Sequence, residues 1–86
     1  IMLVVYTMDS CIYCDKAKLY LKSCDISFEE KNISTDKQAK DFLLEEGHKT
    51  IPQIYYNDKL LVEGGANGLL SLSKEKIKTR MENLNG

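Results

Sequence analysis

Hydrophobic residues change their spacing several times along the 86-residue chain, and each change marks an expected element of structure. Residues 3–6, LVVY, are apolar on both faces, which favours a strand buried in the middle of a sheet. From Cys11 to Cys24 apolar residues recur at helical spacing, so we expect a helix over this stretch. Asp9 and Ser10 stand just before it, and both are good N-cap residues.

The next segment predicts a strand followed by a helix. Residues 26–33, ISFEEKNI, predict a second strand, with Ile26, Phe28 and Ile33 as its apolar positions. The sequence STDKQAKDFLLEEG then favours a helix, because Thr35 and Gln38 have the spacing of a capping box. Gly47 stands where a helix commonly ends.

The last part of the chain predicts a hairpin and further helix. The runs IPQIYY and KLLVE are separated by Asn57 and Asp58, a pair typical of tight hairpins. Helical spacing returns from Asn67, and Ser73 can cap a separate last helix. The expected order is β-α-β-α-β-β-α, in which the helix-linked strands are parallel and the hairpin is antiparallel. We therefore expect one α/β domain with a mixed sheet over residues 1–86.

Composition excludes several classes of protein. The chain is 43% hydrophobic and 29% charged, with a formal net charge of −1 and both signs mixed along it. This balance gives no basic surface for nucleic acid or for a membrane. No apolar run approaches the roughly 18–20 residues that span a bilayer. Three cysteines do not suit the disulfide framework of a secreted miniprotein, so the cytoplasm is the expected compartment.

The candidate chemistry lies in the sequence CIYC, which places Cys11 and Cys14 at the start of a helix. The thiolate is the reactive form of cysteine, and a helix N-terminus can lower a thiol pKa from about 8.5 to roughly 3.5–7.5. Cys14 lies one turn deeper on nearly the same helix face. We therefore expect Cys11 to attack a disulfide and Cys14 to resolve the product.

Two other interpretations compete with this one. The two cysteines can simply pack in a helix, or they can join Cys24 and His48 in a zinc site. Against zinc, Cys24 lies about 15 Å away along the helix axis, which is too far for one tetrahedral ion. We expect Cys24 to pack at the helix end and His48 to lie solvated in a loop. Locally, Pro52 has the pattern of an ordinary proline at a strand start.

Together these motifs resemble the glutaredoxins, a branch of the thioredoxin fold. VVYTMDSCIYCDKAKLYL is similar to the family's first strand, active-site motif and helix, and TIPQIYYNDKLLVEGG to its cis-proline strand, hairpin and Gly-Gly turn. The resemblance implies a four-stranded mixed sheet flanked by helices, with Pro52 in the cis form beside Cys11. It also implies a monomeric thiol–disulfide oxidoreductase in which Cys11 and Cys14 are catalytic. Glutathione is then the co-substrate, disulfide-containing or glutathionylated proteins are the partners, and no metal or organic cofactor is expected.

The resemblance further implies which residues bind glutathione. The backbone of Ile51 is expected to pair with the cysteinyl part, and Lys49 to meet a carboxylate. Backbone N–H groups at Ala66 and Asn67 would receive the γ-glutamyl carboxylate. The implied set is Tyr13, Lys49, Thr50, Ile51, Pro52, Gly65, Ala66 and Asn67.

Several positions depart from the family pattern. Ile12 replaces the usual motif proline, and Met8 stands where many members carry a lysine. Ala39 occupies a position where relatives often have glutamine or a basic residue, and Asn67 with Gly68 replaces a pair that ends in an acidic residue. Each missing charge-assisted contact would be worth about 1.5–3 kcal/mol. Two alternatives therefore stay open: a redoxin reduced by a reductase with weak glutathione binding, and a glutathione-assisted carrier of an iron–sulfur cluster or metal.

Overall fold

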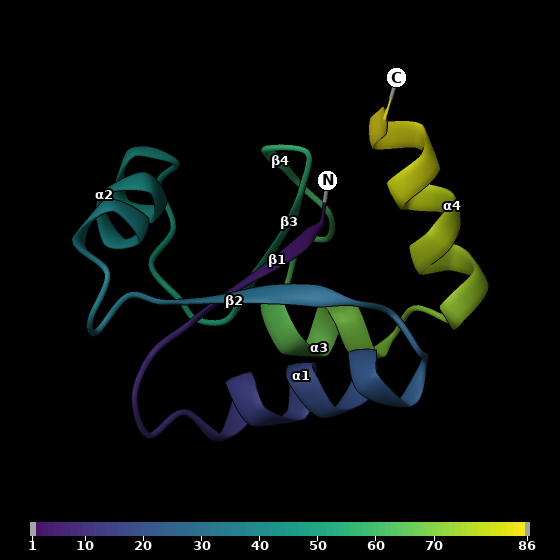
Figure 1. The fold of residues 1–86 in the computed structure, drawn as a ribbon, viewed down its shortest axis with the longest axis horizontal. Coiled ribbons are helices and arrows are strands. Elements are labelled where there is room, and N and C mark those ends of the chain that lie inside the picture. Colours follow the sequence, from purple (N-terminus) through teal and green to yellow (C-terminus); the bar gives the residue numbers. More distant parts are fainter. Residues whose placement is uncertain (1, 86) are drawn as a thin grey trace.

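The computed structural model describes residues 2–85, so residues 1 and 86, at the ends of the expected domain, lie outside the described part. The chain forms a four-stranded mixed sheet with helices on both faces (Figure 1). The elements are β1 (Leu3–Thr7), α1 (Ile12–Ser23), β2 (Phe28–Asn32), α2 (Lys37–Glu45), β3 (Gln53–Tyr56), β4 (Lys59–Leu60), α3 (Gly65–Leu70) and α4 (Lys74–Asn85). The sheet order is β2-β1-β3-β4, with β1 parallel to β2 and antiparallel to β3. The predicted α/β architecture is confirmed.

The central strand β1 is buried because both faces of the sheet are covered. Successive side chains of a strand point to opposite faces. Leu3 and Val5 face the side covered by α1 and α3, which lie next to each other below the sheet in Figure 1. Tyr6 faces the other side and packs against Leu43 of α2. Coverage on both sides explains why the run is apolar throughout.

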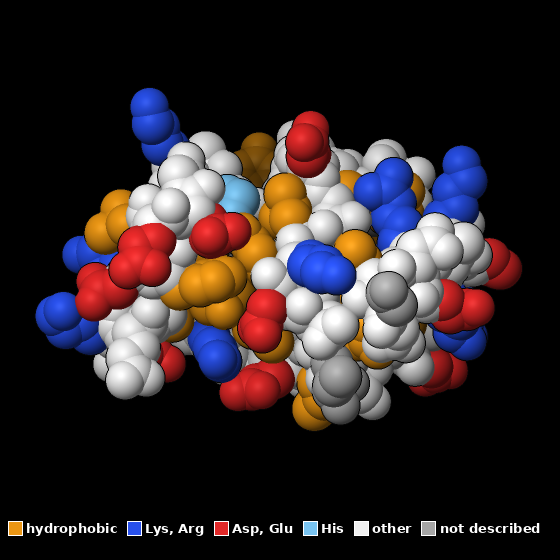
Figure 2. Space-filling view, turned by 90° about the horizontal axis from the view of Figure 1, so that it is seen from above, with side chains coloured by type: hydrophobic (Ala, Val, Ile, Leu, Met, Phe, Trp, Pro, Cys, Tyr) orange, Lys and Arg blue, Asp and Glu red, His pale blue; other side chains and the backbone are white. Residues whose placement is uncertain are grey.

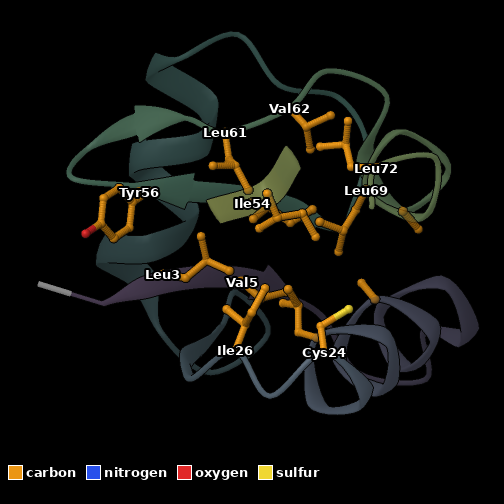
Figure 3. Close-up of a cluster of buried hydrophobic side chains, with 14 residues drawn as sticks. Leu3, Val5, Cys24, Ile26, Ile54, Tyr56, Leu61, Val62, Leu69 and Leu72 are labelled. Carbon is orange, nitrogen blue, oxygen red and sulfur yellow. The ribbon is translucent and has the colours of Figure 1, made fainter. Parts of the chain in front are cut away.

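The larger hydrophobic core lies between the sheet and helices α1, α3 and α4 (Figure 3). Leu21, Leu69 and Ile77 bring one fully buried side chain from each of these helices. Each such side chain contributes about 1.5–3 kcal/mol when it leaves water. Cys24 ends α1, and Figure 3 shows its sulfur among the carbon atoms of this core. The prediction that Cys24 is a packing residue is confirmed.

The smaller core, on the α2 side, is aromatic. Phe42 lies 5.4 Å from the ring of Tyr6 and 5.0 Å from that of Tyr55, measured between centroids. Burial raises the pKa of Tyr55 to about 12, and the negative charge of Glu46 adds to the shift. His48 Nε2 lies 2.6 Å from the Tyr55 hydroxyl, so the prediction of a solvated loop histidine is wrong. The ring is half-buried because it covers the edge of this aromatic cluster.

The start of α2 also differs from the prediction. Asp36, and not Thr35, is the N-cap residue, and its side chain accepts a hydrogen bond from the Ala39 N–H at 3.1 Å. The Thr35 hydroxyl instead donates to the carbonyl of Asn32 at the end of β2. The turn after β2 therefore uses Thr35, and the helix begins one residue later than expected.

Strand boundaries follow local hydrogen bonds. Strand β2 begins at Phe28 because the N–H of Ile26 still bonds to the carbonyl of Leu21 at the end of α1. The predicted fourth strand is shorter than KLLVE and includes only the two residues of β4. The hairpin before it is as predicted, since Asn57 (φ 53°) and Asp58 (φ 61°) both take the left-handed conformation of a tight turn.

The C-terminal segment contains two helices. Residues 71–73 separate α3 from α4, and the Ser73 hydroxyl accepts a hydrogen bond from the Lys76 N–H at 3.2 Å, so its predicted capping role is confirmed. Acidic and basic side chains are interspersed over the face of the molecule in Figure 2. Within residues 2–85, no helix combines the length and apolar character needed to cross a bilayer.

Candidate functional site

The two cysteines of CIYC form a disulfide at the start of α1. Their Cα atoms are 5.2 Å apart, within the roughly 4.4–6.8 Å that disulfides allow. Cys11 is partly exposed, whereas Cys14 is only 1% exposed. The outer sulfur is therefore the one that a substrate can reach, as the sequence predicted from the helix geometry.

Cys11 is itself the N-cap residue of α1. Its Sγ accepts a hydrogen bond from the backbone N–H of Cys14 at 3.1 Å. The predicted caps, Asp9 and Ser10, are wrong: the carboxylate of Asp9 accepts from the side chain of Asn32 instead. An N–H group aimed at Cys11 Sγ, together with the helix dipole, favours negative charge on this sulfur after reduction.

A partly exposed network of hydrogen bonds and an ion pair joins α1 to the sheet. The hydroxyl of Thr7, at the end of β1, donates to Glu30 of β2 at 2.7 Å. Lys18 of α1 lies 3.1 Å from the same carboxylate. The Thr7 hydrogen bond, and secondarily Lys18, lower the pKa of Glu30. The network therefore links β1 and β2 to the middle of α1.

A cleft of about 380 Å³ reaches the CIYC motif at Tyr13, which stands between the two cysteines in the sequence, and we call it the cis-proline cleft. It is lined by Tyr13, Thr50, Ile51, Pro52, Gly64, Gly65, Ala66 and Asn67. The peptide bond between Ile51 and Pro52 is cis, which confirms the prediction from the family resemblance. Residues from α1, the loop before β3 and the start of α3 thus meet in one hollow.

Two glycines allow the start of α3 to approach its neighbours. Gly65 has φ +57°, and a Cβ atom on it would lie 2.9 Å from the carbonyl oxygen of Pro52. A Cβ atom on Gly68 would lie 1.9 Å from the carbonyl oxygen of Glu63. No side chain fits at position 68 with this backbone, which gives a physical reason for the absence of the family's acidic residue there.

The cis-proline cleft brings together all but one of the predicted glutathione residues. The exception is Lys49, which lies in a neighbouring groove together with Met8. Among residues 2–85, neither backbone polar group of Ile51 takes part in a hydrogen bond. Gly64 lines the cleft but was not in the predicted set, although the Gly-Gly pair at the end of the hairpin is a signal that could have indicated it.

Tyr13 is an exposed wall of the cleft, and Lys16 accompanies it. The ammonium group of Lys16 lies 5.2 Å from the centre of the Tyr13 ring, in cation–π contact. This contact holds the charge of Lys16 over the tyrosine, one helical turn after the cysteine pair begins. The cleft wall therefore has a positive charge beside it.

Other candidate sites have weaker chemistry. Within the described residues, no three His, Cys, Asp or Glu side chains are grouped to hold a metal ion. A larger hollow of about 650 Å³ lies at the edge of β2, between Lys18 and Phe28. It contains no cysteine and none of the predicted site residues. The cysteine pair and the cis-proline cleft are therefore the candidate site.

Comparison with known proteins agrees with this geometry. The Glutaredoxin family model matches residues 3–61. Glutaredoxin 1 of Rickettsia conorii is 35% identical over 85 residues, which cover 94% of this chain and 81% of the relative. Glutaredoxin 3 of Escherichia coli is 32% identical over 69 residues, covering 79% of this chain and 81% of the relative.

A solved structure shows the same fold. The solution structure of a glutaredoxin from Brucella melitensis superposes with a TM-score of 0.73 at 26% identity, covering 94% of this chain and 88% of that one. The same family is indicated by the fold, the cysteine pair, the cis-proline and the sequence relatives. The chain belongs to the glutaredoxin family of thiol–disulfide oxidoreductases and has the thioredoxin-like fold of that family.

Proposed function

We propose that this protein is a glutathione-dependent oxidoreductase that reduces protein disulfides and mixed disulfides of proteins with glutathione. One observation carries the proposal: the cis-proline cleft reaches the CIYC motif at Tyr13, and it is lined by Ile51, whose backbone polar groups bond to no other described residue. Its volume of about 380 Å³ is within the roughly 300–1,000 Å³ of small-molecule clefts. The partners are glutathione and glutathionylated proteins, met by a monomer in the cytoplasm.

Backbone groups supply most of the proposed recognition. The free N–H and carbonyl groups of Ile51 pair with the cysteinyl residue of glutathione, in the manner of an added strand. The first turn of α3 leaves the N–H groups of Ala66 and Asn67 without helical partners, so they receive the γ-glutamyl carboxylate. Tyr13 covers one side of the peptide. Lys49 stands outside the cleft and is the least supported member of the proposed set.

For a glutathionylated protein, Cys11 acts alone. Its thiolate attacks the glutathione sulfur, a bond forms between Cys11 and glutathione, and the client leaves as a thiolate that takes up a proton. A second glutathione thiolate then attacks the bound glutathione sulfur. This step releases oxidised glutathione and returns Cys11 as the thiolate.

For a protein disulfide, Cys14 is also required. Cys11 attacks one client sulfur and forms a mixed disulfide, and the other client sulfur leaves as a thiol. The Cys14 thiolate then attacks Cys11 Sγ, which releases the reduced client and leaves the Cys11–Cys14 disulfide seen in the structure. Two molecules of glutathione reduce this disulfide and leave as oxidised glutathione.

Replacement of Cys11 tests the proposal directly. Cys11→Ser should abolish glutathione-dependent reduction of a glutathionylated peptide, because no other partly exposed sulfur lies at the helix start. Cys24→Ala is the matched control, since it removes a cysteine from the core and leaves the cleft intact. Activity of Cys11→Ser equal to that of the control would contradict the assignment of roles.

A second candidate function is favoured by the groove that contains Met8. The exposed side chain of Met8 carries no charge, and Lys49 lines this groove and not the cis-proline cleft. Weak binding of glutathione would leave reduction of the disulfide to a protein reductase. Incubation of the oxidised protein with glutathione, or with a thioredoxin reductase and its reductant, separates the two candidates by which one regenerates the dithiol.

A further inference from the structure

A second hollow adjoins the cis-proline cleft and is mainly apolar. It has a volume of about 340 Å³, and we call it the Met8 groove. Its lining is Met8, Ile33, Lys40, Leu43, Leu44, His48, Lys49, Thr50 and Ile51. Leu43 is buried and forms the floor, whereas Met8 and Leu44 remain 46% and 61% exposed. Two exposed apolar side chains beside a hollow are a feature of surfaces that bind a partner.

Sheet register explains why the groove lies at the reactive end of the molecule. Thr7 pairs with Asn32 of β2, so the next residue, Met8, comes beside Ile33. The antiparallel register of β1 with β3, continued past Tyr6 and Gln53, brings Met8 opposite Ile51. Met8 precedes Cys11 by three residues, and so lies at most about 11 Å from it along the chain.

The Met8 groove and the cis-proline cleft share one wall. Thr50 and Ile51 line both hollows, so a peptide joined to Cys11 and lying on the cleft can continue into the groove. The continuity also limits where the occupant's apolar side chain stands. An extended chain rises about 3.3–3.6 Å per residue, and Met8 lies at most about 11 Å from Cys11. The aliphatic side chain of the client therefore lies within about four residues of the client cysteine that forms the mixed disulfide.

Two lysines at the groove favour an acidic residue beside the aliphatic side chain of the bound peptide. Lys40 and Lys49 are both exposed at the groove. Within residues 2–85, neither ammonium group has a carboxylate within ion-pair distance. The acidic residues at the end of α2, Glu45 and Glu46, do not line the groove. An acidic side chain on the occupant would therefore meet two cations without a competing carboxylate at the groove wall.

We propose that the Met8 groove is a client-recognition site, which binds an aliphatic side chain and an adjacent acidic side chain close to the client's reactive cysteine. The proposal rests on the proposed attack of Cys11 on protein disulfides, and it specifies which disulfides are preferred. The aliphatic side chain fills the space between Met8, Leu44 and Leu43. The acidic side chain interacts with Lys40 or Lys49 at the rim, where charge mainly accelerates encounter.

Four synthetic peptides of equal length test the proposal. Each peptide has one internal disulfide. On both sides of each cysteine, the second residue away is Leu or Ser and the third is Glu or Lys. The four peptides are therefore Leu–Glu, Leu–Lys, Ser–Glu and Ser–Lys. The protein is reduced beforehand, freed of reductant and mixed with each peptide in a single turnover. The measured quantity is the second-order rate constant for reduction of the peptide.

The wild-type protein should reduce the Leu–Glu peptide about tenfold faster than the Ser–Lys peptide, the effect expected when one aliphatic side chain is largely buried. Leu44→Ser should remove the preference for Leu. Leu19→Ser is its matched control, because Leu19 is 65% exposed on α1 and lines neither hollow. Lys40→Glu should largely remove the preference for Glu over Lys, because the new carboxylate offsets the charge of Lys49, and Lys59→Glu, on β4, should preserve it. The preference for Glu should also weaken as salt is added.

Equal rates for all four peptides, or equal losses in the groove variants and their controls, would overturn the proposal. A small disulfide without side chains, hydroxyethyl disulfide, separates this failure from failure of the proposed function. If it is reduced at the same rate by every variant while the peptides show no preference, only the groove assignment is wrong. If the reduced wild-type protein reduces neither the small disulfide nor the peptides, the proposed chemistry of Cys11 is wrong as well. Because glutathione is absent from the assay, neither result depends on the source of reducing equivalents.

Discussion

Gly65 lies directly against the carbonyl oxygen of Pro52, at a separation that leaves no room for a methyl group. The glycine begins α3, and the proline follows the cis peptide bond before β3. Two segments that are thirteen residues apart in the sequence are thereby held in contact without a hydrogen bond between them. The width of the cis-proline cleft depends on this contact, because each of the two residues lines one side of it.

Gly65→Ala should therefore destabilise the protein and widen or distort the cleft. The left-handed backbone alone costs an alanine about 1–2 kcal/mol, and the contact with Pro52 adds to this cost. Gly47→Ala is the control, since Gly47 has φ +80° but nothing within 4 Å of its missing Cβ. Urea unfolding should show a larger loss of stability for Gly65→Ala. An equal loss in the two variants would mean that the contact with Pro52 has no energetic effect.

Cys14→Ser should separate the two proposed routes. The variant keeps Cys11 at the helix cap, so reduction of a glutathionylated peptide should continue. It has no second sulfur to attack the mixed disulfide, so most of its activity toward a protein disulfide should be lost, and the trapped mixed disulfide should be visible by mass spectrometry. Equal loss in both assays would contradict a resolving role for Cys14.

Met8→Lys should improve the use of glutathione. A cation at the exposed position just after β1 would interact with a glutathione carboxylate, and an exposed ion pair is worth up to about 1 kcal/mol, or roughly fivefold in KM. Met2→Lys is a closely matched control, because Met2 is also 46% exposed but lies at the other end of the strand. The gain should disappear in high salt. No difference between the two variants would show that glutathione does not extend to Met8.

The alkaline stability of the protein should depend on Tyr55. Burial raises its pKa to about 12 from an ordinary value of 10, so the folded state holds the hydroxyl proton more tightly than the unfolded state does. This contribution is fully present below pH 10 and is lost as the pH rises through about 12. It amounts to roughly 1–3 kcal/mol.

Tyr55→Phe tests this assignment. The variant loses the contact with His48, which costs about 1 kcal/mol at neutral pH, but it should not share the additional loss between pH 10 and 12. Urea unfolding of both proteins across that range measures the difference in stability. A constant difference throughout would show that the Tyr55 hydroxyl ionises equally in the folded and unfolded states.

Local patterns in the sequence were sufficient to predict the first strand, the hairpin and the helix start that carries the cysteines. β1 was predicted because both of its faces are buried, and the hairpin because Asn57 and Asp58 tolerate left-handed backbone. The positions of Cys11 and Cys14 at a helix start also follow from adjacent residues. The hairpin and the cysteine positions have their physical reason within a few residues, whereas the burial of β1 depends on α1, α2 and α3 and is indicated locally only by its apolar run.

Features that depend on distant contacts were not predictable in the same way. Asp9 is a good N-cap by its chemistry, but Asn32, twenty-three residues later, engages its carboxylate, and Cys11 takes the cap instead. Lys49 follows the pattern of a cleft residue, yet the chain entering β3 directs it to the Met8 groove. Gly68 lacks a side chain because of the Glu63 carbonyl, a contact that no single-sequence pattern reveals.

Because Cys24 is enclosed in the larger core, chemical modification of its thiol can report when that core opens. In the reduced, folded protein a thiol-modifying reagent should react readily with the partly exposed Cys11 and more slowly with the buried Cys14, and it should reach Cys24, the third thiol, only when the core opens. The slowest phase of modification, that of Cys24, then reports the opening of the core in native buffer without any denaturant. In this small redox protein, the reactivity of thiols therefore measures the stability of the fold as well as the activity of the site.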